Sequence, residues 1–163
     1  MHATRANYLA ILWVALLWPP LAQAKSTHDG KYSADSLTKT LPLASGQSVW
    51  LDVNVADIHI LPNLDDRHLQ LVIQPNHEIT VEEMQSWIRQ FDVNGNQANI
   101  RLHMPKQGNE SGKVTLYVPA STALNVDLDI GDLTIDSIGG NKDLNVNVGR
   151  LKLGGLNPGA SAL

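Results

Sequence analysis

Four aspartates between positions 127 and 136 are the residues whose type and spacing could most readily do chemistry. Asp127, Asp129 and Asp132 could supply carboxylate oxygens to Ca²⁺, which takes six to eight oxygen ligands. Asp127 and Asp129 would also lie roughly 7 Å apart on one face of a strand, a separation that inverting glycoside hydrolases use. However, the spacing does not match an EF-hand loop, and Asp127 and Asp129 alternate with apolar residues. We therefore expect these two aspartates to face solvent, and we treat all three as weak metal-ligand candidates.

The other reactive side chains form no recognisable catalytic motif. The chain has no cysteine, no nucleophile elbow, no phosphate-binding glycine loop and no HExxH sequence. A zinc site would need histidines to converge from separate strands, because none of them has helical i, i+3 or i+4 spacing: His59, His68, His77 and His103. The sequence therefore predicts no enzyme, no catalytic residue, no cofactor and no metal site beyond the weak aspartate candidates.

Three ten-residue stretches of the chain align without a gap: Leu51–Ile60, Val126–Ile135 and Leu144–Leu153. Apolar residues alternate in each stretch, which predicts a strand with one buried face. The alternation slips by one at the sixth and seventh positions, where the small residues Ala56, Gly131 and Gly149 favour a tight corner. The second and third stretches lie 18 residues apart, about one turn of a β-solenoid. We therefore predict a mainly β fold with a β-solenoid or β-helix-like repeat sheet, whose apolar positions, including Val146 and Leu151, are buried.

The remaining segments predict further strands and one short α-helix. Residues 37–43, 68–73, 100–104 and 114–118 have the alternation of strands, and Asn94-Gly95 is a strong hairpin signal. In contrast, the apolar residues of 81–91 recur every three or four positions. Thr80 and Glu83 have the spacing of a capping box. We predict a helix over about 81–90 that packs on the sheet through Trp87.

The run Gly112–Leu153 resembles a bacterial adhesin-like family of unknown function with β-strand repeats (DUF4097-like). The residues that carry the resemblance are Val118-Pro119, which ends a strand, followed by Gly131–Ile135 and Gly149–Leu153. The resemblance covers 37–163 and implies a secreted or envelope-exposed β-repeat domain with no defined enzyme activity. Arg150 departs from the family pattern, which has Asp at this position.

The N-terminus has the pattern of a secretory signal peptide over residues 1–24. A single basic residue precedes the apolar run Tyr8–Trp18, and small residues lead to a predicted cleavage between Ala24 and Lys25. This run is too short to span a bilayer, so we expect no stable membrane span after cleavage. Residues 25–36 are expected to form a flexible leader, and 37–163 a single domain. The protein is thus predicted to be exported, to the periplasm, the cell surface or the medium.

Charge and composition narrow the expected partners. The formal net charge of −4 argues against nucleic acid, which favours basic surfaces. Two function classes remain. The first is a non-enzymatic, adhesin-like interaction domain that binds an unknown envelope or surface partner, protein or glycan, through a polar sheet face or an edge. The second is a glycan-acting hydrolase that uses surface carboxylates. Because the last repeat leaves a sheet edge, edge-strand self-association could also occur.

Overall fold

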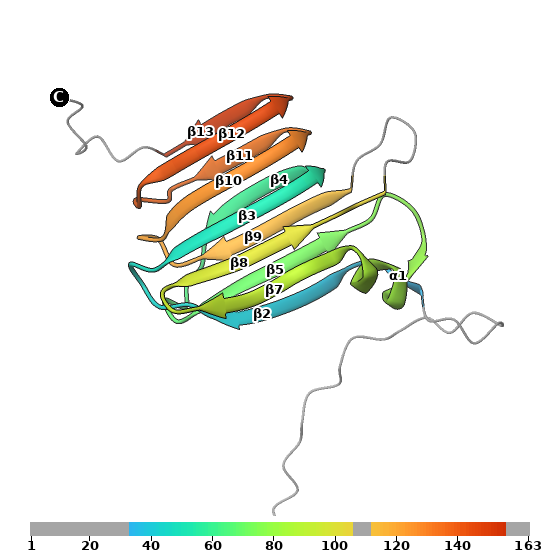
Figure 1. Ribbon diagram of the computed structural model, residues 1–163, viewed down its shortest axis with the longest axis horizontal. Coiled ribbons are helices and arrows are strands. Elements are labelled where there is room, and N and C mark those ends of the chain that lie inside the picture. Colours follow the sequence, from blue (N-terminus) through green and yellow to red (C-terminus); the bar gives the residue numbers. More distant parts are fainter. Residues whose placement is uncertain (1–32, 106–111, 156–163) are drawn as a thin grey trace, which may run out of the picture.

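The computed structural model describes residues 33–105 and 112–155, which form two large β-sheets packed face to face and a separate two-stranded sheet (Figure 1). The five-stranded sheet has the order β12-β10-β3-β8-β7, and the six-stranded sheet has the order β13-β11-β4-β9-β5-β2. The elements are β1 (Ser33–Ala34), β2 (Leu37–Pro42), β3 (Ser48–Val55), β4 (Asp57–Pro62), β5 (His68–Gln74), β6 (Ile79–Thr80), α1 (Val81–Ser86), β7 (Ile88–Asn94), β8 (Gln97–Leu102), β9 (Lys113–Val118), β10 (Ala123–Ile130), β11 (Leu133–Asp136), β12 (Lys142–Val148) and β13 (Leu151–Gly154). The predicted signal peptide and its cleavage site at Ala24 and Lys25 lie outside the described residues.

The core lies between the two sheets and is built from the alternating apolar residues of each strand. Leu51, Ile100 and Leu128 of the five-stranded sheet are fully buried, as are Ile60 and Leu116 of the six-stranded sheet. Their polar neighbours in sequence face away from the core, because side chains alternate along a strand. The prediction of a mainly β fold with one short helix is confirmed.

Each of the three aligned stretches forms one strand of the five-stranded sheet, a corner and one strand of the six-stranded sheet. We call these repeat units 1 (β3–β4), 2 (β10–β11) and 3 (β12–β13). They stack in parallel and in register, so that Val126 pairs with both Leu51 and Leu144. The corners stack closely: Gly131 has φ +137°, and a Cβ at this position would overlap the carbonyl oxygen of Ala56. The predicted corners at small residues are confirmed.

The prediction of a β-solenoid or β-helix is wrong. Both sheets are mixed, because β7 pairs with β8 in antiparallel orientation, and β5 pairs in the same orientation with β2 and β9. Parallel stacking of strand–corner–strand units is confined to the three repeat units and their pairing with β8 and β9. The 18-residue spacing of units 2 and 3 is therefore a local repeat within a two-layer mixed β fold.

Repeat unit 3 is also less buried than its sequence pattern predicts. Val148 is 62% exposed, Leu151 47% and Leu153 41%, whereas Val146 is half-buried against the core. Within the described residues, no strand pairs with the outer edges of β12 and β13. The apolar side chains of unit 3 are thus covered on one side by unit 2 and lack cover on the other. We call this part of the molecule the open end (Figure 1).

The helix is shorter than predicted. Its N-cap is Thr80, whose Oγ1 accepts a hydrogen bond from the Glu83 amide at 3.1 Å, as the capping-box spacing predicted. Trp87 ends the helix and is buried, and the chain then continues as β7. The strand predicted over residues 37–43 is confirmed as β2, which lies at one edge of the six-stranded sheet, and so is the Asn94-Gly95 hairpin between β7 and β8. Two residues of the predicted leader form β1, which pairs with β6.

Candidate binding face

The outer face of the five-stranded sheet carries polar side chains in rows that run across the strands. In one row, Asp127 of β10 pairs with Asp52 of β3, and Asp52 pairs with Arg101 of β8. In the next row, Asn125 pairs with Trp50, and Trp50 pairs with Asn99. These residues face outward because their neighbours along each strand point into the core. The in-register pairing therefore determines which polar groups meet.

Arg101 of β8 is held on this face by two contacts with residues of β3. Its Nε donates to Asp52 Oδ2 at 2.8 Å, and its guanidinium carbon lies 4.9 Å from the centre of the Trp50 ring. A cation over an indole face is attracted by the ring quadrupole. One face of the Trp50 ring is thus occupied by Arg101. The guanidinium has further N–H donors beyond Nε, and its side chain is 49% exposed, so these donors can reach a ligand.

A shallow hollow of about 480 Å³ lies beside Arg101 on this face. Its lining consists of Asp52, Asn54, Arg89, Arg101, Leu102, His103 and Asp129. Arg89 reaches the hollow because of a β-bulge: Ile88 pairs with Leu102 and Gln90 with Arg101, so Arg89 is the extra residue.

The backbone around His103 is fixed on both sides. The amide of His103 donates to the Trp87 carbonyl at 2.7 Å. The side chain of Asn54 makes two hydrogen bonds to the backbone of Met104, at 2.8 and 2.9 Å. By contrast, the side chains of Arg89 and His103 make no hydrogen bond or ion pair with another described residue. Within the part of the chain that the structure describes, the hollow therefore combines a hydrogen-bonded backbone with two polar side chains that have no partner.

The three metal-ligand candidates are not brought together. Asp127 and Asp129 lie on the outer face, where they accept hydrogen bonds from Asn145 and Asn147 at 3.1 and 3.4 Å. Asp132 lies at the corner of repeat unit 2. Within 33–105 and 112–155, no three His, Asp or Glu side chains are grouped in a way that could hold a metal ion. Asp127 and Asp129 face solvent, as their alternation with apolar residues predicts, and their partners are side-chain amides of β12.

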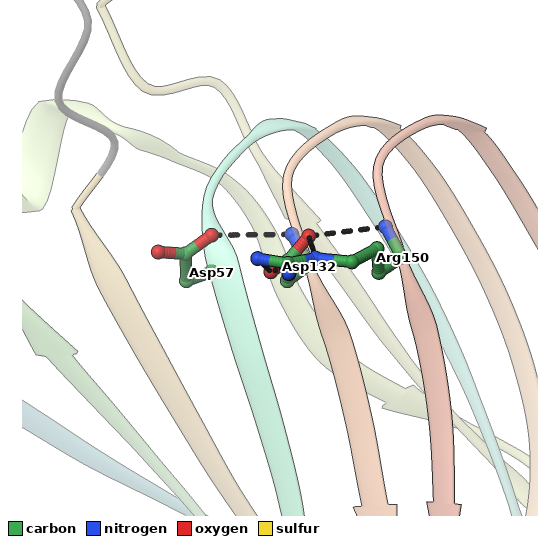
Figure 2. Close-up of polar contacts among 3 residues, drawn as sticks. All are labelled: Asp57, Asp132 and Arg150. Carbon is green, nitrogen blue, oxygen red and sulfur yellow. Dashed lines mark hydrogen bonds and ion pairs between the residues drawn. The ribbon is translucent and has the colours of Figure 1, made fainter.

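Asp132 belongs to a ladder of contacts that links the three corners (Figure 2). The Asp132 amide donates to Asp57 Oδ1 at 3.1 Å, and the Arg150 amide donates to Asp132 Oδ1 at 3.0 Å. Units 1 and 2 thus each supply a carboxylate that accepts the corner amide of the next unit. In repeat unit 3 the corresponding residue is Arg150, whose side chain has no hydrogen-bond acceptor. Its Nε and Nη2 instead donate back to Asp132 Oδ2 at 3.1 and 2.8 Å.

The Arg150–Asp132 contact affects both ionisable groups. The side-chain hydrogen bond from Arg150 is the main reason that the pKa of Asp132 lies below its ordinary value. The same bond raises the pKa of Arg150. Both groups are in contact with water, so solvent screens the interaction.

The histidines do not converge on a zinc site. His59 lies 2.7 Å from Asp136, and His68 lies 2.8 Å from Asp65, in two separate pairs. His77 contacts its neighbour Asn76, and His103 lines the hollow.

The importance of the hollow was missed from the sequence, because it depends on which strands are neighbours. Arg89 fell within the predicted helix, whereas the bulge of β7 places it beside residues of β3 and β8. Two residues that the sequence analysis singled out, His103 and Asp129, line the hollow, but nothing in the sequence indicated that they lie near each other.

Comparisons with known proteins identify no family. No protein-family model and no curated protein match the chain. Solved structures with a similar arrangement include a candidate cell adhesion protein from Clostridium sporogenes, at 14% identity and a TM-score of 0.40, over 73% of this chain and 58% of that one. A candidate adhesin from Bacteroides fragilis matches at 16% identity and a TM-score of 0.42, over 72% of this chain and 55% of that one. A candidate lipid-binding protein from Parabacteroides distasonis matches at 15% identity and a TM-score of 0.32, over 77% of this chain and 54% of that one.

The chain spans between 54% and 58% of the length of these three structures. Likenesses at such identities and TM-scores do not establish a family or a ligand for this chain, and the resemblance to the DUF4097-like family stays a prediction. Among the described residues, none of the helical structure is long and apolar enough to cross a membrane.

Proposed function

We propose that this protein is an exported, non-enzymatic, adhesin-like interaction domain that binds a hydroxyl-rich glycan of a cell envelope through the outer face of its five-stranded sheet. The observation that carries the proposal is the hollow beside Arg101, at whose wall Arg89 and His103 make no hydrogen bond or ion pair with another described residue. Its volume of about 480 Å³ lies in the range of small-molecule sites.

The chemistry of the lining favours hydroxyl groups. A sugar hydroxyl is both a donor and an acceptor, and the hollow offers the matching groups on its two sides. Arg89, Arg101 and His103 supply donors, whereas Asp52 and Asp129 supply carboxylate acceptors. The charges of these five side chains nearly balance, which suits an uncharged polar ligand better than a strongly anionic one. The hollow is also open, so a chain of sugars could enter and leave along the sheet.

Export is supported by the N-terminal pattern, in which an apolar run is followed by small residues before Lys25. The resemblance to the adhesin-like family points in the same direction. The alternative, a glycan-acting hydrolase, rests on the pair Asp127 and Asp129. Because these carboxylates accept hydrogen bonds from Asn145 and Asn147 on an open sheet surface, we do not propose them as an acid–base pair.

The test is binding to a glycan array, followed by calorimetric titration of any glycan that binds. The double variant R89Q/H103Q replaces the Arg89 and His103 side chains of the hollow with neutral amides. The control is R67Q/H77Q, which changes two exposed residues of the same types that do not line the hollow. We expect R89Q/H103Q to weaken binding at least about tenfold and the control to bind as the wild type does. Equal binding by both variants, or binding to no glycan on the array, would overturn the proposal.

A further inference from the structure

The open end of the molecule is a surface that the proposed glycan site does not involve. Among the described strands, β12 is the outermost strand at one edge of the five-stranded sheet, and β13 is the outermost strand at the same end of the six-stranded sheet. Both strands present backbone groups at an edge, beside the exposed apolar side chains of Val148, Leu151 and Leu153. Such an edge is a template for pairing with another chain.

The shape of the open end fits a further strand pair. Repeat unit 3 stacks on unit 2 with the same backbone geometry as unit 2 on unit 1: Gly149 has φ +151°, and a Cβ there would overlap the carbonyl oxygen of Gly131. Leu133 of unit 2 pairs with Leu151 in the same way as it pairs with Ile58. The backbone geometry alone would therefore allow a further strand pair to cover unit 3 in the way that unit 3 covers unit 2.

The charges of unit 3 oppose this. We propose that Arg150 and Lys152 keep the open end from pairing with a second copy of this chain. The equivalent residues of unit 2 are Asp132 and Thr134, so both changes introduce a cation at the edge. Arg150 is 87% exposed, and Lys152 makes no hydrogen bond or ion pair with another described residue.

Arg150 opposes parallel pairing, which is the arrangement that a strand from a partly unfolded second copy would adopt. In units 1 and 2, the corner carboxylate accepts the amide of the next unit at 3.1 and 3.0 Å (Figure 2). At Arg150 an added strand would find donors only, and its corner amide would lose water without gaining an acceptor. The hydrogen bonds from Arg150 to Asp132 hold the Arg150 side chain over unit 2, so its guanidinium is directed away from an added strand.

Lys152 opposes antiparallel pairing, which is the arrangement of two folded copies related by a two-fold axis. If Leu151 of one copy faced Leu151 of the other, Arg150 would face Lys152. If Leu151 faced Leu153 of the other copy, Lys152 would face Lys152. Like charges directly opposite one another destabilise an antiparallel pair, and lysine is a common means of protecting sheet edges. The two registers that cover Leu151 with leucine are thus both opposed by charge.

The experiment converts the corner of unit 3 into that of unit 2 with the variant R150D/K152T. The full exported chain is measured by size-exclusion chromatography with light scattering over one concentration range. The control variant R67D/K113T makes the same change in net charge at two exposed residues that lie outside the open end. We expect the wild type and the control to stay monomeric, and R150D/K152T to form dimers or larger species with a dissociation constant at least about tenfold lower.

Two outcomes would overturn the proposal: R150D/K152T remaining as monomeric as the control, or the wild type associating as strongly as the variant. Circular dichroism separates ordered association from misfolding. If R150D/K152T loses its β-sheet signal, the single variant K152T decides, because it keeps the Arg150–Asp132 contact. K152T must then associate more strongly than the control K113T. A glycan that binds the outer face would still bind R150D/K152T, so failure here is distinct from failure of the proposed function.

Discussion

Asp132 is the side chain on which two kinds of contact meet. It accepts the Arg150 backbone amide, as Asp57 accepts that of Asp132, and it also accepts the Arg150 guanidinium. Backbone and side-chain donors both favour the ionised carboxylate, and the guanidinium adds its charge. These contacts lower the pKa of Asp132. Because the folded-state pKa lies below the unfolded value, the contacts stabilise the fold fully above the unfolded pKa, and this stability is lost as pH falls through the folded pKa.

We therefore expect the Asp132 carboxyl to titrate below the ordinary aspartate value of about 3.9. Removing the guanidinium with R150N should move its midpoint upward, toward that value. The measurement is an NMR titration of the side-chain carboxyl carbons in the wild type and in R150N. Asp65, whose pKa is lowered mainly by His68, serves as the internal control and should not move. An unchanged midpoint for Asp132 in R150N would show that the backbone amide alone sets its pKa.

The three repeat units have one sequence pattern but different burial, and this difference is a property of their neighbours. Ile135 of unit 2 and Leu153 of unit 3 are paired residues, at equivalent positions. Ile135 is 1% exposed because units 1 and 3 cover it on both sides, whereas Leu153 is 41% exposed. Periodicity therefore predicts which face of a strand points inward, and position in the stack decides how much of that face is covered.

Truncation of these two residues should have unequal effects on stability. I135A removes a buried side chain and should lower the free energy of unfolding by about 2–5 kcal/mol. L153A removes one that is already partly in water, and its cost should be about 1 kcal/mol or less. Urea denaturation of both variants measures the difference. Equal costs would mean that Leu153 is covered in solution by something other than the described residues.

The segment from Thr80 to Phe91 shows where local pattern reaches its limit. The spacing of Met84, Trp87 and Phe91 satisfies a helical face, and the Thr80 cap does begin a helix. Yet Ile88 onward pairs with β8, and tertiary contacts override the helical pattern. Here the apolar spacing of a short helix followed by a bulged strand coincides with that of a longer helix. The bulge that brings Arg89 to the hollow was hidden by the same coincidence.

Features of the fold that depend on local signals are predicted from the sequence, whereas features that depend on long-range strand pairing are not. The Asn94-Gly95 turn, the corner at Gly131 and the outward position of Asp127 follow from backbone preference and alternation, and all were predicted. The mixed order of the sheets was not, because nothing near β5 in sequence indicates that it lies between β2 and β9. The hollow depends on this kind of long-range pairing, which is why it was recognised only in the structure.

The order of strands also predicts how stability is distributed through the molecule. β3 and β4 each have a strand on both sides, whereas β12 and β13 have one neighbour among the described strands. Amides of edge strands open with a smaller free energy than those of central strands, since fewer contacts are broken. In native-state hydrogen exchange we expect the amides of β12 and β13 to exchange before those of β3 and β4, with β10 and β11 between them. The comparison of Leu153 with Ile135 and Ile60 is matched, because the three residues pair in register. Equal protection in all three units would mean that the stack opens as one cooperative unit, and that the exposure of unit 3 does not weaken its hydrogen bonds.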